Sequence, residues 1–222
     1  MYKGVFSVII FSALSSSIFI SCGTDTPVTP TTTDVNIQIN DSAIKHAYIT
    51  NFFPNTKFRN DDDFAAVAWI ADTVPYIGRT LFKFNLSAIP QNATVTSAVL
   101  LLNYDQEPIH YTGVGHHQDS GSNSSYMQRI TQNWVDTSAT WNNQPGITQT
   151  NQISIDSSSS EFQNYSIDLT SAVNDMVQNP SLNYGFLFRL KKETPLRVLG
   201  FSWGIRNSSL KPILQVTYRI SQ

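Results

Sequence analysis

The stretch from Gly78 to Leu102 constrains the fold more than any other part of the sequence. It reads GRTLFKFNLSAIPQNATVTSAVLLL and predicts two strands, residues 79–86 and 95–102, joined by a connection that contains turn residues. Because side chains alternate faces along a strand, the first strand places an apolar row on one side, made of Phe82, Phe84 and Leu86. The second is an almost unbroken apolar run, typical of a strand buried on both faces. The stretch therefore predicts the middle of a two-layer β domain.

The rest of the sequence predicts further short strands and one short helix. Apolar patterns predict strands over residues 35–39, 47–53, 64–70, 184–190, 197–203 and 213–220. Residues 169–177 carry apolar side chains at helical spacing, and Asn179 and Pro180 end that helix. A chain of 222 residues with this pattern is expected to hold one such domain. We predict an all-β fold, a jelly-roll β-sandwich of about eight to ten strands with one short helix.

The N-terminal segment has the pattern of an export signal. Lys3 precedes an apolar run over residues 4–20, and small residues follow. The segment resembles a bacterial lipoprotein signal, although Phe19 stands where leucine is more common. The resemblance implies cleavage before Cys22, lipidation of that cysteine and loss of the signal peptide, residues 1–21. The alternative is that Cys22, the only cysteine of the chain, is a buried free thiol.

Residues 22–34 are predicted to form a tether rather than part of the fold. The segment is dense in Thr and Pro and has no apolar periodicity, so it is stiff and has nothing to pack. A lipid, a tether and a β domain over residues 35–222 together predict a lipid-anchored protein of the cell outer membrane. We expect it to be surface-exposed and monomeric, and to contact the membrane only through its anchor.

The formal net charge of −2 argues against a nucleic-acid partner, since nucleic-acid-binding proteins usually carry a basic excess. The charge is nevertheless uneven. Half of the 14 Lys and Arg residues lie between residues 189 and 219, where Glu193 is the only acid. They are Arg189, Lys191, Lys192, Arg197, Arg206, Lys211 and Arg219. They indicate either a locally basic surface or solvated side chains that point in different directions.

Three adjacent carboxylates, Asp61, Asp62 and Asp63, precede the predicted strand over residues 64–70. Carboxylates are ligands for calcium, but these lack the alternate spacing of a helix–loop calcium site, and neighbours on a strand point to opposite sides. A solvated acidic turn is the favoured interpretation, and a structural calcium ion is the alternative. We therefore predict no metal ligands and no cofactor.

The segment over residues 105–133 has weak periodicity, which is typical of functional or disordered connections. His116 and His117 are adjacent, and neighbours on an extended chain seldom turn both rings to one metal. Candidate catalytic groups for a lyase or hydrolase are His110, Tyr111, His116, His117, Asp105, Glu107 and Asp119. No motif fixes their geometry. We predict that the protein is not an enzyme, with a polysaccharide lyase or hydrolase as the less favoured alternative.

Four separated segments together resemble the DNRLRE-domain family. They are PNTKF at residues 54–58, the stretch over residues 78–102, WVDTSATWNNQP at residues 134–145, and the closing group NYGFLFRL and RNSSLKPILQVTY. Their order and spacing agree over residues 35–220. The resemblance implies a jelly-roll carbohydrate-binding module of exported bacterial and archaeal proteins, some of which bind acidic polysaccharides such as alginate. This chain departs from the pattern at residues 201–204, where Phe-Ser-Trp-Gly replaces small polar residues.

Binding a sugar in water requires a flat aromatic platform and fixed polar groups, and a uronic acid adds a carboxylate that an arginine fork can hold. Trp203 and Arg206 lie three residues apart around Gly204, at a strand end expected to be exposed, and are the favoured ligand-binding pair. Three cations join them if the strands converge, namely Arg79, Lys191 and Arg197.

Trp69 and Tyr76 flank the loop over residues 71–77 and form a second candidate binding site. For every tryptophan the alternative is packing in the core. Trp134 and Trp141 are expected to pin a loop rather than to hold sugar.

The sequence thus predicts a surface lipoprotein with a non-catalytic carbohydrate-binding module. The expected partner is a polysaccharide, uronate-containing in the favoured version. The alternative is a structural or adhesion module that binds protein at the cell surface.

Overall fold

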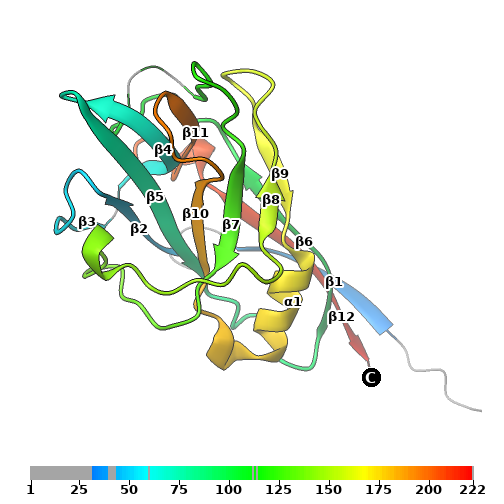
Figure 1. Ribbon diagram of the computed structural model, residues 1–222. Coiled ribbons are helices and arrows are strands. Elements are labelled where there is room, and N and C mark those ends of the chain that lie inside the picture. Colours follow the sequence, from blue (N-terminus) through cyan, green and yellow to red (C-terminus); the bar gives the residue numbers. More distant parts are fainter. Residues whose placement is uncertain (1–31, 40–43, 60, 112, 114, 222) are drawn as a thin grey trace, which may run out of the picture. The chain divides into compact units, whose positions relative to one another are not determined.

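The computed structural model describes residues 32–39, 44–59, 61–111, 113 and 115–221 (Figure 1). These residues form two antiparallel sheets with one short helix, which confirms the predicted all-β sandwich. The predicted signal segment, Cys22 and all but the last three residues of the predicted tether lie outside the described residues. Those three residues open the first strand, which begins at Thr32 rather than at the predicted residue 35.

The smaller sheet has four strands and includes the two ends of the described chain. Its order is β1 (Thr32–Ile39), β12 (Ile213–Ser221), β6 (Thr94–Leu102) and β9 (Tyr165–Asp168). The prediction that the strand over residues 95–102 is buried on both faces is wrong. Leu100 is fully buried, whereas Val99 and Leu101 are only partly buried, so β6 has one core face and one half-exposed face.

The larger sheet has eight strands. Its main order is β11 (Arg197–Ser202), β4 (Asp63–Ala71), β5 (Val74–Phe84), β10 (Phe186–Leu190), β7 (Ser125–Arg129) and β8 (Ile153–Ile155). The remaining two strands are β2 (Ile44–Thr50), which pairs with β5, and β3 (Phe58–Arg59), which pairs with β2. The strand predicted over residues 47–53 begins and ends three residues earlier, and Phe53 is largely exposed.

The central strand β5 changes partners along its length. Its residues 74–78 pair with β4 and its residues 80–82 with β10, although β4 continues beyond that ladder to Asp63. The Thr80 hydroxyl holds β4 where the ladder has ended, since it accepts a hydrogen bond from the Ala65 N–H and donates one to the Ala65 carbonyl, both at 3.0 Å. Gly78 is needed at the change of partner, because a Cβ there would lie 1.7 Å from the Tyr48 hydroxyl oxygen.

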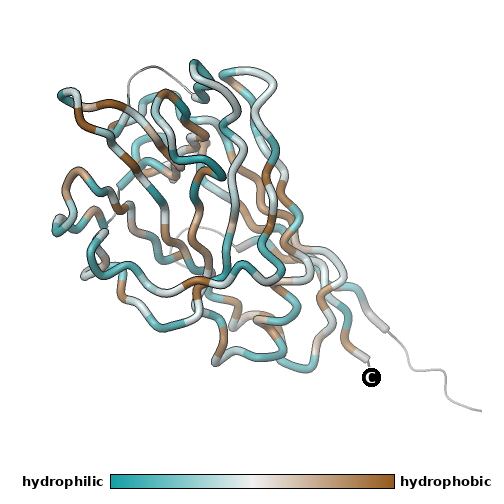
Figure 2. Tube along the Cα trace, in the orientation of Figure 1, coloured by the Kyte–Doolittle hydropathy of each residue, from teal (hydrophilic) through white to brown (hydrophobic). Residues whose placement is uncertain are grey.

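The main core lies between the two sheets, and apolar residues are concentrated along their strands (Figure 2). Phe82, Phe84 and Leu86 are all buried in it, which confirms the predicted row. The connection after β5 carries the chain to β6 in the smaller sheet.

The helix α1 (Thr170–Gln178) lies within one residue of the predicted range and buries three side chains, Val173, Met176 and Val177. Asp168 stabilises its first turn by accepting a hydrogen bond from the Thr170 N–H at 2.8 Å. Within the part of the chain that the structure describes, no helix has the length and hydrophobicity that a bilayer crossing requires.

Candidate functional site

The outer face of the larger sheet has an apolar and a polar part. Side chains of β2, β5 and β10 form the apolar part, which the segment over residues 130–141 covers with Trp134 and Trp141. The Trp134 indole N–H donates to the Tyr184 carbonyl at 2.7 Å, so this segment is pinned as predicted. The polar part, here called the polar face, comprises Arg79, Tyr126, Gln128, Trp141, Gln152, Ser154, Arg189, Lys191 and Glu193.

Arg79 is the most firmly held cation of the polar face. Its Nε and Nη2 donate to the two carboxylate oxygens of Glu193, each at 2.7 Å, and its Nη1 donates to Gln144 at 2.8 Å. The guanidinium also lies over the indole of Trp141, 4.5 Å from the ring centroid. This bidentate and stacked arrangement fixes the plane of the guanidinium before any ligand arrives.

Arg189 extends the network across the next strands. Its Nε donates to the Gln128 side-chain carbonyl at 3.0 Å, and Gln128 in turn donates to Gln152 at 2.7 Å. Arg189 also lies 3.7 Å from Glu193, which therefore serves two arginines. Gln128 is fully buried although polar, and its two hydrogen bonds account for that burial.

Lys191 completes the polar face at the end of β10. Its ammonium donates to the Ser154 hydroxyl and lies 5.1 Å from the ring centroid of Tyr126. Arg189, Tyr126 and Ser154 are direct neighbours across the strands, since Arg189 pairs with Tyr126 in one ladder and Tyr126 with Ser154 in the next. The polar face is therefore one continuous row rather than scattered residues.

The charge balance of the polar face favours anions. Arg79, Arg189 and Lys191 bring three positive charges and Glu193 one negative charge, and all four side chains are partly exposed. Arginine has five N–H donors, and Arg79 commits three of them within the protein. Carboxylates or hydroxyl groups can be held by the remaining donors.

A second basic position lies at the end of the same sheet. Lys45 and Lys83 stand opposite each other on β2 and β5, beside a cavity of about 400 Å³ that is also lined by Phe84, Met176 and Asn183. Burial, and then the charge of Lys45, lower the pKa of Lys83. Like charges directly opposite each other destabilise a sheet, so this pair too is suited to an anion.

Trp203 does not lie at an exposed strand end, and that prediction is wrong. The residue is 6 % exposed and packs in the main core. Its partner in the predicted site, Arg206, is instead tied to Asp62, to which its Nε donates at 2.8 Å. Burial raises the pKa of Asp62, but hydrogen bonds from Arg206 and from the Ile205 N–H outweigh that effect and lower it.

The other predicted site residues are dispersed. Arg79 and Lys191 share the polar face, but Arg197 is buried and donates hydrogen bonds to Thr194 and Ser120, joining two loops. Tyr76 is also buried, and burial raises its pKa to about 12. Trp69 is half-buried beside the ring of His117, with 5.5 Å between the ring centroids.

His116 and His117 do not form a catalytic or metal-binding pair. His116 Nδ1 accepts a hydrogen bond from the Gly200 N–H at 3.1 Å, and its Nε2 bonds the Gln163 carbonyl at 2.8 Å. The His117 ring packs against Trp69 and Tyr111 instead. The two rings thus have separate structural partners.

Sequence reasoning missed Tyr126 and Gln128 as parts of a site, because they lie in the segment with weak periodicity. It counted Arg189 only as one basic residue of a group. The alternation of Arg189 and Lys191 at the end of a predicted strand was the available signal, since residues two apart share a face.

No curated protein matches the chain. The profile of carbohydrate-binding module family 96 matches residues 38–218, which span the domain from β1 to β12. The chain therefore belongs to carbohydrate-binding module family 96.

Proposed function

We propose that this module binds an acidic polysaccharide along the polar face without cleaving it. The observation that carries the proposal is that Arg79, Arg189 and Lys191 gather from neighbouring strands on one open sheet face with Glu193 as the one acid among the residues of that face. Uronate carboxylates would accept charge-assisted hydrogen bonds from these cations. The hydroxyl groups of the sugar would meet Gln152 and Ser154.

The arrangement suits binding better than bond cleavage. A glycosidase needs two carboxyl groups that face each other across the substrate. On the polar face, Glu193 is the one carboxylate, and it is already paired with Arg79 and close to Arg189. Incubation with alginate or pectin should therefore yield no unsaturated or reducing-end products, and product formation by the purified chain would contradict this part of the proposal.

Affinity electrophoresis through gels that contain alginate, pectin or a neutral glucan tests the binding directly. We expect retardation in the acidic gels, with dissociation constants on the order of micromolar to millimolar for one open face. Retardation should weaken as the salt concentration rises from about 50 to 500 mM, because exposed charge pairs are screened. Unchanged mobility in every gel would overturn the proposal and favour the alternative of a protein-binding adhesion module.

Two matched arginine variants test whether the polar face is the binding site. Arg189→Ala removes a cation from the polar face, and Arg219→Ala removes one from the smaller sheet, where Arg219 pairs with Asp34 at 3.0 Å. Both lower the net charge equally. Retardation should fall with Arg189→Ala and persist with Arg219→Ala, and equal losses would mean that bulk charge, rather than the polar face, holds the ligand.

We further propose that Cys22 carries a lipid that anchors the module to the outer membrane, facing outward as a monomer. The resemblance of residues 1–22 to a lipoprotein signal supports this proposal, as does the wider resemblance to the DNRLRE-domain family. Cys22→Ser should move the protein from the membrane fraction to the soluble fraction. Retention of this variant in the membrane fraction would overturn the anchor.

A further inference from the structure

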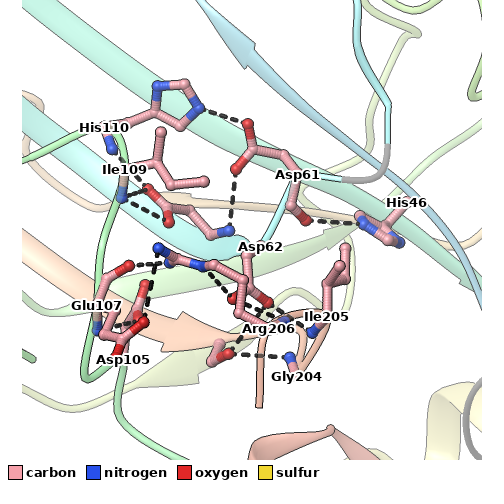
Figure 3. A network of polar contacts seen from close by, with 12 residues as sticks. His46, Asp61, Asp62, Asp105, Glu107, Ile109, His110, Gly204, Ile205 and Arg206 are labelled. Atoms are coloured by element: carbon pink, nitrogen blue, oxygen red, sulfur yellow. Dashed lines mark hydrogen bonds and ion pairs between the residues drawn. The ribbon is translucent and has the colours of Figure 1, made fainter. Parts of the chain in front are cut away.

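The carboxylates at the beginning of β4 belong to a network of polar contacts (Figure 3), and those that are buried bring more negative charge than the neighbouring cations balance. Asp63 is fully buried, Asp105 is 1 % exposed, and the side chain of Asp61 is 8 % exposed. The prediction that residues 61–63 form a solvated acidic turn is therefore wrong. Buried carboxylates are costly unless a cation, a proton or several hydrogen bonds compensate them.

The nearby arginine, Arg206, forms its ion pairs with other acids of this group. Arg206 binds Asp62 at 2.8 Å and approaches the exposed Glu107 carboxylate at 3.9 Å. The Asp62 carboxylate also accepts hydrogen bonds from the Ile205 N–H, at 2.8 Å, and from the Ser202 hydroxyl, at 3.2 Å. Asp61, Asp63 and Asp105 are thus left with one potentially cationic partner among the described ion pairs, His110.

Asp61 and Asp63 are held side by side. The Asp61 carboxylate accepts a hydrogen bond from the Asp63 N–H at 3.0 Å and lies 2.5 Å from His110 Nε2. The Asp63 carboxylate accepts hydrogen bonds from the Ile109 N–H, at 3.0 Å, and the His110 N–H, at 2.8 Å. Ligand atoms of Asp61, Asp63 and His110 all lie within 4.8 Å of one another.

Asp105 supplies the observation that points to a ligand. Its Oδ1 accepts a hydrogen bond from the Glu107 N–H at 2.9 Å, whereas its Oδ2 is buried and has no hydrogen-bond partner within the described part of the chain. Asp63 lies near enough to Asp105 for a hydrogen bond between the two carboxyl groups. A buried carboxyl group with one unpaired oxygen thus lies beside a second buried carboxylate.

The ring of His110 is fixed independently of these acids. It stacks on Tyr48 with 4.3 Å between the ring centroids and 4° between the planes, and the edge of Phe58 packs against it at 5.1 Å. Tyr48 is itself fully buried. His110 is therefore suited to hold Asp61 in place, rather than to move toward an ion.

We propose that Asp61, Asp63 and Asp105 bind a calcium ion, with His110 as the hydrogen-bonding partner that positions Asp61. Calcium is assigned because the donors are carboxylate oxygens, which this hard cation prefers, and because water can supply its further ligands. Zinc would instead require the imidazole nitrogen of His110 as a ligand.

Thermal unfolding of the full chain, stripped with EDTA and titrated separately with Ca²⁺, Mg²⁺ and Zn²⁺, tests the assignment. We expect Tm to rise by several degrees with Ca²⁺ up to about 10 mM, since an ion that binds only the folded state stabilises it. Calorimetric titration of the same protein should show one calcium per chain. Absence of both effects would overturn the site, and a proton shared by Asp63 and Asp105 would then compensate the buried charge. Stabilisation by Zn²⁺ alone would overturn the choice of ion.

Two variants separate a bound ion from a general effect of charge. Asp105→Asn removes the unpaired carboxylate, so it should raise Tm in EDTA and abolish the response to calcium. Glu107→Gln removes a neighbouring carboxylate whose side chain is 75 % exposed, and it should keep the full response. If Asp105→Asn does not fold, Asp61→Asn provides the same comparison. A calcium response that survives in the variant used would overturn the proposed ligand set.

Discussion

The indole of Trp203 lies parallel to the ring of Phe64, with 4.5 Å between the ring centroids and 7° between the planes. The imidazole of His46 also stacks on the indole, at 4.2 Å. Leu199 and Phe201 precede Trp203 at alternate positions and are fully buried, so the tryptophan continues the inward face of β11 beyond its last residue. Its role is to close the core.

Trp203→Ala should therefore act on stability rather than on ligand binding. Removal of a buried tryptophan side chain typically costs about 3–5 kcal/mol of unfolding free energy. Denaturant unfolding measures that loss, and Trp203→Phe should recover part of it by keeping a ring against Phe64. The folded fraction of either variant should bind acidic polysaccharide as the wild type does; a specific loss of binding with intact stability would return Trp203 to the binding site.

Arg79→Lys tests whether the geometry of the polar face matters beyond its charge. Lysine keeps the positive charge but cannot make the two parallel hydrogen bonds to Glu193 or stack flat on Trp141. We expect retardation in alginate gels to fall nearly as far as with Arg79→Ala. Full retention by Arg79→Lys would show that a point charge at this position is sufficient.

Substitution of one of the two facing lysines on β2 and β5 is expected to raise stability and to weaken binding of long chains. Lys83→Gln removes a like-charge pair, which should stabilise the unliganded protein by roughly 0.2–1 kcal/mol. If the polysaccharide extends from the polar face to this end of the sheet, the same variant should weaken retardation of long chains. Short oligosaccharides should bind Lys83→Gln and wild type equally, and parallel losses for both ligand lengths would contradict an extended site.

Local alternation allowed much of the sandwich to be predicted. Phe82 and Phe84 recur at every second position and lie in the core, and the apolar spacing of Val173 and Val177 marks α1. The half-exposure of the second face of β6 could not be predicted. A run of apolar residues fits a strand that is buried on both faces, and it also fits a strand with one buried and one half-exposed face. Val99 and Leu101 show the second case.

The candidate site could be predicted only in part, because its residues meet through pairing between distant strands. Arg79 and Glu193 are 114 residues apart, and nothing local indicates that they form a bidentate pair. The burial of Asp63 likewise depends on backbone N–H groups of residues 109 and 110. Adjacent acids favour a solvated turn unless a remote segment supplies such donors.

Thr80 is predicted to stabilise β4 beyond the end of its ladder with β5. Thr80→Val keeps the volume but leaves the buried N–H and carbonyl of Ala65 without the hydroxyl that serves both, which should cost about 1–3 kcal/mol of unfolding free energy. Thr80→Ser retains the hydroxyl and should lose clearly less stability. If denaturant unfolding shows a loss for Thr80→Ser but none for Thr80→Val, the effect belongs to packing of the methyl group rather than to the hydroxyl.

The environment of His116 predicts that the folded protein loses stability in acid. Burial lowers its pKa to about 4 from an ordinary value of 6.5; the Gln163 carbonyl opposes this shift, and His117 adds to it. The rings of Tyr165 and Phe201 also face the imidazole, and its Nδ1 can accept the Gly200 N–H only when unprotonated. Protonation therefore breaks a hydrogen bond in the folded protein.

Between these two pKa values the unfolded chain binds the proton more readily than the folded one, so the contribution of His116 is complete above pH 6.5 and is lost as the pH falls toward 4. The slope is up to about 1.4 kcal/mol per pH unit. Denaturant unfolding across this range measures the difference in unfolding free energy between the wild type and His116→Gln. This difference should shrink as the pH falls. A constant difference between the two proteins would mean that His116 does not titrate in this window.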